Sequence, residues 1–235
     1  MARHLQNGWT ETATPTFGMT PGQRIAFIRA NTTLMSPPLV PEVQLHLAHE
    51  AVPLWQKTED ELGEMGLPPP FWAFAWVGGQ ALARYVLDQP EIVRGKRIID
   101  LASGSGLVGI AAMQAGAAHV LAADIDRFAL AALALNADVN KVTLQATSED
   151  LLFSPPPECD VILVGDLFYE KSLATRCFTW ARQAQSIGID VLIGDPGRSY
   201  LPSEMLSKLV EYNVPVTRDL EDAEIKRSAV WRLKL

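Results

Sequence analysis

The stretch "IIDLASGSGLVGIAA", residues 98–112, decides the fold of this chain. An apolar segment runs into a glycine-rich turn, and an Ala- and Ile-rich helical pattern follows the turn. Gly104, Gly106 and Gly109 satisfy the G-x-G-x-x-G spacing of a dinucleotide-binding turn. A strand, a tight turn and a helix in this order predict a nucleotide-like ligand at the start of the helix. The turn alone leaves open whether that ligand is a nicotinamide dinucleotide or another nucleotide.

Strand and helix patterns alternate around this stretch from residue 71 onwards. Short apolar strands are predicted at residues 96–102, 118–124, 142–146, 159–166 and 190–195. Helices are predicted at residues 78–88, 106–116, 127–139, 171–185 and 203–212. Two further strands, at 214–220 and 228–235, have no helix between them and are expected to pair antiparallel. The predicted fold is α/β, a Rossmann-like doubly wound and mostly parallel sheet with an antiparallel C-terminal strand pair.

The first 70 residues have a different pattern from the rest of the chain. Residues 1–19 are polar and turn-rich, and we expect them to be disordered. Residues 20–70 are predicted to form a helical N-terminal extension, in which Thr20 caps a helix that begins with Pro21. The segment "LPPP" ends this extension as a rigid boundary. The main domain is therefore predicted to cover residues 71–235.

Composition and charge narrow the class of protein. With 48% hydrophobic and 20% charged residues, the chain is expected to bury a sizeable core. A net charge of -7 argues against a nucleic-acid partner, whose phosphates require a basic surface. Cys159 and Cys177 form no C-x-x-C pair, and together with four histidines they indicate no metal site. The sequence shows neither a membrane-length apolar run nor a secretory signal, so we expect a cytoplasmic protein.

Two features favour S-adenosylmethionine over a nicotinamide dinucleotide. Asp124 lies about 20 residues beyond the turn, where an acidic residue binds ribose hydroxyls, but both ligands contain a ribose. Asp100 ends the strand before the turn, where its charge would repel a pyrophosphate and attract the cationic amino-acid group of S-adenosylmethionine. The predicted sheet also uses nearly all of the chain after Gly109, which leaves no second domain for the substrate of a hydride transfer.

The whole stretch 71–235 resembles the class I, seven-β-strand S-adenosylmethionine-dependent methyltransferases. "IIDLASGSG" resembles their first motif, with Ala102 at the position of a common glycine, and "AADIDRFALAALALNA" resembles the second. "GDLFYE" resembles the D-x-x-Y/F signature of the protein lysine methyltransferase branch. "PPPFWAFAWVGGQALARYVLD" and "IGDPGRSYLP" are similar to the bacterial form of the enzymes that methylate the beta subunit of electron transfer flavoprotein. The resemblance implies a seven-stranded sheet, S-adenosylmethionine as cofactor and a protein lysine as substrate.

These motifs assign the cofactor to residues at the strand ends. Asp100 is expected at the methionine amine, Asp124 at the ribose hydroxyls, and Thr147 with Ser148 beside the adenine. The resemblance places Trp76 over the cofactor. The complete set of predicted cofactor-binding residues is Trp76, Asp100, Ala102, Ser103, Gly104, Gly106, Asp124, Thr147, Ser148 and Gly165.

Asp166 and Tyr169 are the predicted catalytic residues. A lysine ammonium, whose pKa is about 10.4, must lose a proton before its nitrogen can attack a methyl group. Asp166 is expected to hold and aim that amine, and Tyr169 to contribute a hydroxyl or a wall to the amine channel. A structural alternative for Asp166 is to cap the helix that follows it.

Three other interpretations of the sequence compete with a lysine methyltransferase of electron transfer flavoprotein. One is a methyltransferase that acts on ribosomal proteins, and another is an N-methyltransferase of small amines such as a nicotinamide-like ring. The third is a catalytically silent module that only binds S-adenosylmethionine. The acidic residues Asp100, Asp124 and Asp166 argue against the silent module, and the protein-lysine signature argues against a small-amine substrate.

Overall fold

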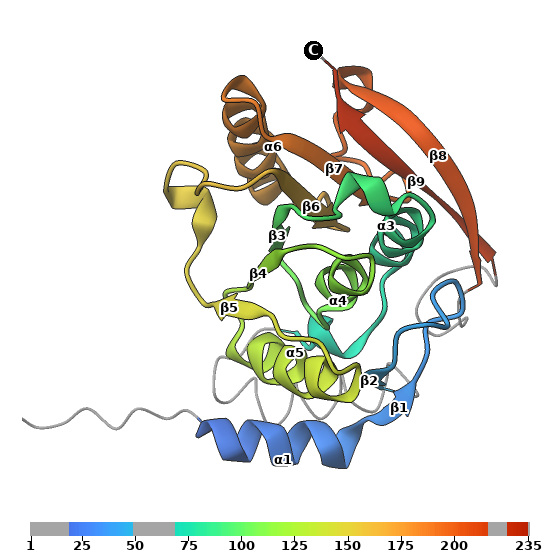
Figure 1. Ribbon diagram of the computed structural model, residues 1–235, viewed down its shortest axis with the longest axis vertical. Helices are drawn as coiled ribbons and strands as arrows, with labels where there is room; N and C mark the ends of the chain where they lie inside the picture. Colours follow the sequence, from blue (N-terminus) through green and yellow to red (C-terminus); the bar gives the residue numbers. More distant parts are fainter. Residues whose placement is uncertain (1–18, 49–68, 216–224, 235) are drawn as a thin grey trace, which may run out of the picture.

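The computed structural model describes residues 19–48, 69–215 and 225–234, and it is built around one seven-stranded sheet (Figure 1). The strand order is β5-β4-β3-β6-β7-β9-β8. The first five are parallel neighbours, and β9 runs antiparallel to both β7 and β8. This arrangement confirms the predicted fold class. The strands are β3 (Arg97–Leu101), β4 (His119–Ala123), β5 (Gln145–Thr147), β6 (Val161–Gly165), β7 (Asp190–Asp195), β8 (Leu206–Pro215) and β9 (Ile225–Leu233).

The direction of chain progression reverses between β3 and β6. From β3 the chain moves outward to β4 and β5, whereas β6 is followed on its other side by β7. At such a reversal the connections leave the carboxyl ends of two adjacent strands in opposite directions and open a crevice. The strands β3 and β6 pair through residues 98–101 and 161–164, so their carboxyl ends lie side by side.

Helices cover both faces of the sheet, as near-continuous apolar strands require. The helices α3 and α4 pack on one face, against β7, β9, β3 and β4, and α6 packs on the opposite face against β7. The predicted helices between the parallel strands are confirmed. The helices are α1 (Pro21–Asn31), α3 (Val77–Asp88), α4 (Leu107–Gln114), α5 (Arg127–Val139) and α6 (Lys171–Ser186).

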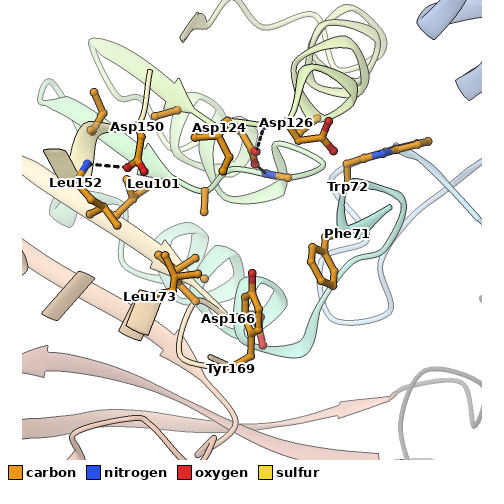
Figure 2. A pocket seen from close by; sticks show the side chains of 18 of the residues that line it. Phe71, Trp72, Leu101, Asp124, Asp126, Asp150, Leu152, Asp166, Tyr169 and Leu173 are labelled. Carbon is orange, nitrogen blue, oxygen red and sulfur yellow. Dashed lines mark hydrogen bonds between the residues drawn. The ribbon is translucent and has the colours of Figure 1, made fainter. Parts of the chain in front are cut away.

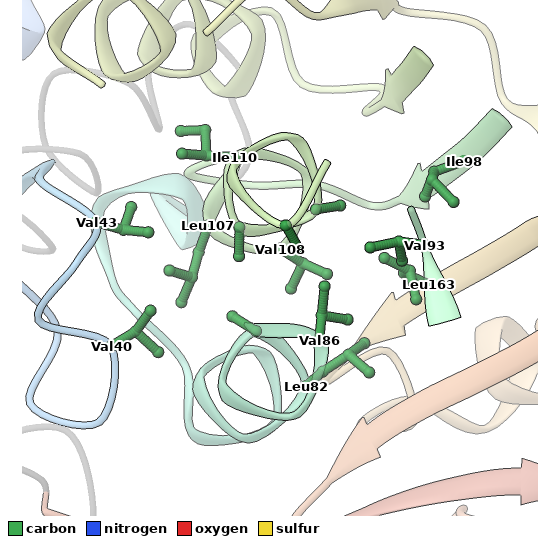
Figure 3. Close-up of a cluster of buried hydrophobic side chains, with 14 of the residues drawn as sticks. Val40, Val43, Leu82, Val86, Val93, Ile98, Leu107, Val108, Ile110 and Leu163 are labelled. Atoms are coloured by element: carbon green, nitrogen blue, oxygen red, sulfur yellow. The ribbon is translucent and has the colours of Figure 1, made fainter. Parts of the chain in front are cut away.

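The largest buried cluster lies between the sheet and the pair α3 and α4. Figure 3 shows Leu82 and Val86 of α3 facing Leu107 and Val108 of α4, with Val40 of the N-terminal segment beside them. All of these side chains are at most 5% exposed. Removal of so much apolar surface from water is the main stabilising contribution to the fold. The N-terminal segment therefore shares the core of the main domain.

The N-terminal segment is only partly helical. Helix α1 begins as predicted, with Thr20 and Gln23 forming a capping box, and it packs against α5. The expected helical pattern is wrong at β1 (Thr33–Met35) and β2 (Leu45–Leu47), which pair antiparallel. Val43, Leu45 and Leu47 alternate with polar residues, which is the period of a strand and not of a helix. The expectations for residues 1–18 and 49–68 lie outside the described residues.

The predicted helix at 203–212 is also wrong. A single 3-10 turn, Ser203–Met205, leads into β8, which pairs with β9 to the end of its length. Val210, Tyr212 and Val214 are the more buried residues and alternate with exposed ones, so tertiary pairing follows the period of two. Within the described ranges, no helix combines the length and apolar character needed to cross a membrane.

Candidate functional site

A cavity of about 440 Å³ opens at the carboxyl ends of β3, β4 and β6, at the reversal point of the sheet. This volume is within the range of small-molecule sites in proteins. Figure 2 shows Asp124, which follows β4, and Asp166 and Tyr169, which follow β6, around the cavity. Of the predicted site residues, seven line it: Trp76, Ala102, Gly104, Asp124, Gly165, Asp166 and Tyr169.

The glycine-rich turn after β3 forms one wall of the cavity through its backbone. Ala102 and Gly104 both have positive φ, at 54° and 52°, and both line the cavity. Gly106, with a φ of 82°, begins α4 instead, and a Cβ at this position would overlap the side chain of Leu133. Ser103 is not among the lining residues, and its Oγ is buried without a hydrogen-bond partner. The turn thus separates residues that face the cavity from residues that shape the backbone.

Asp100 is buried behind the turn and does not line the cavity. Its Oδ2 accepts a 2.8 Å hydrogen bond from the backbone N–H of Gly109 in the first turn of α4. Burial raises the pKa of Asp100 to about 7, and this hydrogen bond opposes the increase. Gly106, the residue before α4, has no side chain to cap the helix, so Asp100 of β3 supplies the acceptor. The expected contact with a methionine amine stays a prediction.

Asp124 directly follows β4, and its carboxylate lines the cavity. Its Oδ2 accepts from the N–H of Gly104 at 2.8 Å, and its Oδ1 accepts from the N–H of Asp126 at 2.9 Å. A carboxylate has about four acceptor positions, so about two stay available. Two further acceptor positions on one rigid carboxylate suit the two hydroxyls of a ribose. Asp126 itself caps α5 by accepting from the N–H of Phe128.

The far end of the cavity is formed by residues just beyond those predicted for the adenine. Thr147 and Ser148 are not lining residues; the Thr147 carbonyl accepts from the N–H of Asp124 at 3.0 Å. Asp150 lines the cavity, accepts from the N–H of Leu152 at 3.0 Å and pairs with Arg176 at 2.8 Å. The "ED" before the apolar "LLF" is a helix-start pattern that could have identified this corner.

Asp166 lies at the end of β6 and is only 8% exposed. Its Oδ2 accepts from the N–H of Gly79 in the first turn of α3 at 2.7 Å, and its Oδ1 accepts from Arg198 Nη2 at 2.9 Å. Burial raises the pKa of Asp166 to about 6, while the charge and hydrogen bond of Arg198 lower it. Asp166 has a φ of 55°, and its N–H donates to the carbonyl of Gly194 at 2.9 Å. The carboxylate is therefore fixed at the base of the cavity.

Glu170, and not Asp166, caps the following helix. Its carboxylate accepts from the N–H of Ser172 at the start of α6. The alternative prediction, that Asp166 caps the helix that follows it, is therefore wrong, because Asp166 accepts its hydrogen bond from the first turn of α3. Arg198 lies in the quoted segment "IGDPGRSYLP" but is not among the predicted site residues, because its contact with Asp166 joins the segments that follow β6 and β7.

Aromatic side chains form the outer wall beside Asp166. The rings of Phe71 and Tyr169 lie 5.5 Å apart, and Trp76 donates its indole N–H to the Phe71 carbonyl at 2.9 Å. All three line the cavity, and Tyr169 is half-exposed at its mouth. Burial raises the pKa of the Tyr169 hydroxyl, so it stays neutral near neutral pH. These rings form a partly exposed aromatic wall of the cavity.

The lining fits S-adenosylmethionine better than a dinucleotide. Its carboxylates outnumber its cations, which disfavours a pyrophosphate and suits a ligand with an ammonium and a sulfonium. Leu151 and Leu152 offer an apolar end, while Asp124 offers the ribose acceptors. Among the described residues, no group of His, Cys, Asp and Glu side chains is placed to hold a metal ion.

Comparisons with known proteins show which methyltransferases this chain is similar to. A family model described as ribosomal protein L11 methyltransferase (PrmA) matches residues 80–165. The electron transfer flavoprotein beta subunit lysine methyltransferase of Xenopus laevis is 37% identical over 98% of this chain and 97% of its own length. The enzyme of the same name from Mus musculus is 38% identical over 88% of this chain and 82% of its own length. A solved Thermoplasma acidophilum protein, 16% identical with a TM-score of 0.50, covers 66% of this chain and 89% of its own and shares the fold.

Proposed function

This chain belongs to the family of electron transfer flavoprotein beta subunit lysine methyltransferases, and from that membership we propose that its substrate is a lysine of such a beta subunit. The protein is an S-adenosylmethionine-dependent lysine methyltransferase. The proposal of the substrate is supported by the names of relatives that align with most of the chain.

The observation that carries the catalytic proposal is the Asp166 carboxylate at the base of the cavity. With one hydrogen bond from Gly79 and one from Arg198, it keeps about two acceptor positions for an incoming amine. A pKa of about 6 leaves Asp166 ionised above neutral pH, and far too weak a base to remove the proton of a lysine outright. We therefore assign Asp166 to holding and aiming the amine.

The walls of the cavity favour the neutral amine that the reaction needs. Phe71, Trp76 and Tyr169 surround the approach to Asp166, and an apolar surrounding lowers the pKa of an ammonium. A proton released there passes to solvent at the open side, where Tyr169 is 47% exposed. When bound, S-adenosylmethionine supplies a methyl group on a sulfonium, with a neutral thioether as the leaving group.

The residues proposed to hold the cofactor lie on the other side of the same cavity. Asp124 is assigned to the ribose hydroxyls, and the turn at Ala102 and Gly104 to the methionine end. Leu151 and Leu152, with Asp150, are assigned to the adenine in place of Thr147 and Ser148. This assignment puts the cofactor ribose at the end of β4 and the substrate amine at the end of β6, and β3 lies between these two strands.

A ribosomal protein is the second candidate substrate. One observation favours it, the match of residues 80–165 to the family model named for ribosomal protein L11 methyltransferase. Incubation with labelled S-adenosylmethionine separates the candidates. We expect label on recombinant electron transfer flavoprotein beta subunit, and label on ribosomal proteins alone would replace the proposed substrate.

The role of Asp166 is tested by Asp166→Asn, which keeps the shape of the side chain and removes its charge. We expect transfer to the protein substrate to fall at least about tenfold, roughly 1.4 kcal/mol of transition-state stabilisation. Cofactor affinity, measured by calorimetry, should change little because Asp124 and the turn are intact. Glu170→Gln is the matched control, since Glu170 is exposed and lies outside the cavity lining. A folded Asp166→Asn variant with an unchanged rate would reduce Asp166 to a cap of α3.

A further inference from the structure

The cation that holds Asp166 in this structure comes from the segment after β7. Arg198 Nη2 lies 2.9 Å from Asp166 Oδ1, and both side chains line the cavity. The guanidinium therefore takes one acceptor position of the carboxylate to which the proposed function assigns the substrate amine. A lysine arrives as an ammonium, and two cations on one small carboxylate repel each other, so the arriving lysine competes with Arg198.

A second acidic partner for Arg198 lies at the end of β7. Asp195 is completely buried, and its Oδ1 accepts from the backbone N–H groups of Gly197 and Arg198, each at 2.7 Å. Its Oδ2 is also buried but has no hydrogen-bond partner, and it lies 4.0 Å from Arg198 Nε. A buried carboxylate oxygen without a donor is costly, and it creates a position that a guanidinium can occupy.

The backbone around Arg198 is fixed while its side chain lies between the two carboxylates. The two N–H bonds to Asp195 Oδ1 hold the turn at residues 197 and 198 in place. The side chain of Arg198 is 22% exposed, and its Nε lies only 4.0 Å from Asp195 Oδ2. Movement from Asp166 to Asp195 thus needs a change of side-chain torsions and no rearrangement of the segment.

We propose that Arg198 is a positioning residue with two binding positions, holding Asp166 before the substrate arrives and turning onto Asp195 Oδ2 when a lysine amine takes its place. The inference rests on the proposed role of Asp166 as the acceptor of the amine. Arg198 then keeps the catalytic carboxylate aimed in the empty site, and Asp195 compensates for the contact that the substrate replaces. Arg198 would therefore influence how tightly the protein substrate binds, although it makes no hydrogen bond to the substrate amine and takes no part in the bond changes of the reaction.

The charges around Asp166 make this role visible in the pH dependence of transfer. Arg198 and Asp195 face it from the end of β7, and α3 contributes the N–H of Gly79 and no charge. Arg198 lowers the pKa of Asp166 against the effect of burial, so Arg198→Met should raise that pKa. The acid limb of the rate profile should then move at least about one pH unit upward, and Arg198→Lys, which keeps the charge, should restore most of it.

A double-mutant cycle tests the second position. Asp195→Asn keeps the acceptor for the two backbone N–H groups and replaces Oδ2 by a donor, so we expect KM for the protein substrate to rise at least about fivefold with a smaller change in kcat. KM for S-adenosylmethionine should not change. In the Arg198→Met background the same substitution should change KM for the protein less than about twofold, because no guanidinium remains to be accommodated.

Asp190 and Arg232 provide the control cycle, because they form an Asp–Arg pair at 2.9 Å at the opposite end of β7. Asp190→Asn and Arg232→Met should leave both KM values unchanged. If Asp195→Asn does not fold, Asp195→Ser removes the carboxylate and keeps a hydroxyl acceptor for the turn. Equal increases in KM with and without Arg198, or no increase in either, would overturn the inference. Full transfer by Asp166→Asn would instead overturn the proposed function.

Discussion

Asp100 and Asp166 each accept a hydrogen bond from the first turn of a helix whose preceding residue supplies no side-chain cap. Asp100 binds the first turn of α4 through Gly109, and Asp166 binds the first turn of α3 through Gly79. Neither helix has a side-chain cap from the residue before it. The positive end of a helix stabilises a nearby carboxylate, so each aspartate is fixed by the fold. Single residues here serve the backbone and the cavity at once.

Asp100 gives a prediction about stability and pH in the absence of cofactor. Burial raises the pKa of Asp100 from 3.8 to about 7. Because the folded-state pKa is raised, this carboxyl stabilises the protein most below about pH 4, and that contribution is lost as the pH rises through 7. Asp100→Asn should remove this dependence of the free energy of unfolding on pH. From pH 5 to pH 8, the free energy of unfolding of the variant should therefore rise by roughly 2 kcal/mol relative to that of the parent.

Urea denaturation at pH 5 and at pH 8 measures this difference. The variant should retain part of the parent's dependence of stability on pH, because burial also raises the pKa of Asp126 and of Asp166 to about 6. The informative quantity is therefore the change in slope between variant and parent. Identical slopes would show that Asp100 is not protonated in the folded protein at pH 5.

Sequence analysis located the residues whose position depends on one strand, and missed those that depend on two. Asp124 and Asp166 end apolar strands, and the structure brings both to the cavity. Arg198 reaches the cavity only because β6 and β7 are neighbours, which no local pattern encodes. The absence of a capping residue before "VGGQ" and before "LVGI" implies an acceptor from elsewhere in the chain, which Asp166 and Asp100 supply.

At the scale of elements, the errors share one physical cause. Residues 45–47 and residues 206–212 form strands in segments that were predicted as helical, and apolar and polar side chains alternate in β2 and in the second half of β8. Long apolar strands such as β6 and amphipathic helices such as α6 were predictable, because burial of a face fixes their period. β8 is mostly exposed, so its conformation is set by pairing with β9.

The close crossing of α3 over the ends of β6 and β7 gives a prediction about packing. A Cβ at Gly78 would lie 2.6 Å from Asp166 Oδ2 and would overlap the carbonyl oxygen of Gly194. Gly78→Ala should therefore move α3 and Asp166 apart, with a loss of about 1–3 kcal/mol in the free energy of unfolding. Transfer to protein should fall with it, because the N–H of Gly79 no longer holds the carboxylate.

Gly79→Ala is the matched control for this crossing. It adds the same methyl group one residue later in α3, where the nearest atom is 3.9 Å away. Alanine also favours the helix over glycine by about 1 kcal/mol. Thermal unfolding and transfer rates of the two variants should diverge, and equal behaviour of the pair would contradict the role of the crossing.

At the scale of the whole molecule, the N-terminal segment braces the cofactor turn. Asn136 of α5 is completely buried; its Oδ1 accepts from the N–H of His46 at 2.7 Å, and its Nδ2 donates to the carbonyl of Ser105 at 2.8 Å. One side chain thus links β2 to the turn before α4. Ile28 and Trp72 belong to the same buried cluster as Phe128 of α5, so apolar contacts support this link. The described residues before the main domain are part of its packing.

The gathering of carboxylates at the cofactor cavity makes ligand binding a proton-release reaction. Burial raises the pKa of Asp100 to about 7 and those of Asp126 and Asp166 to about 6, so near pH 6 the empty protein carries protons on these three carboxyls. A cationic ligand lowers those pKa values, and protons leave as it enters. The observed binding enthalpy of S-adenosylmethionine should therefore differ between phosphate and Bis-Tris at pH 6.5, in proportion to the ionisation enthalpy of the buffer. Equal enthalpies in the two buffers would show that the carboxylates are already ionised in the empty site.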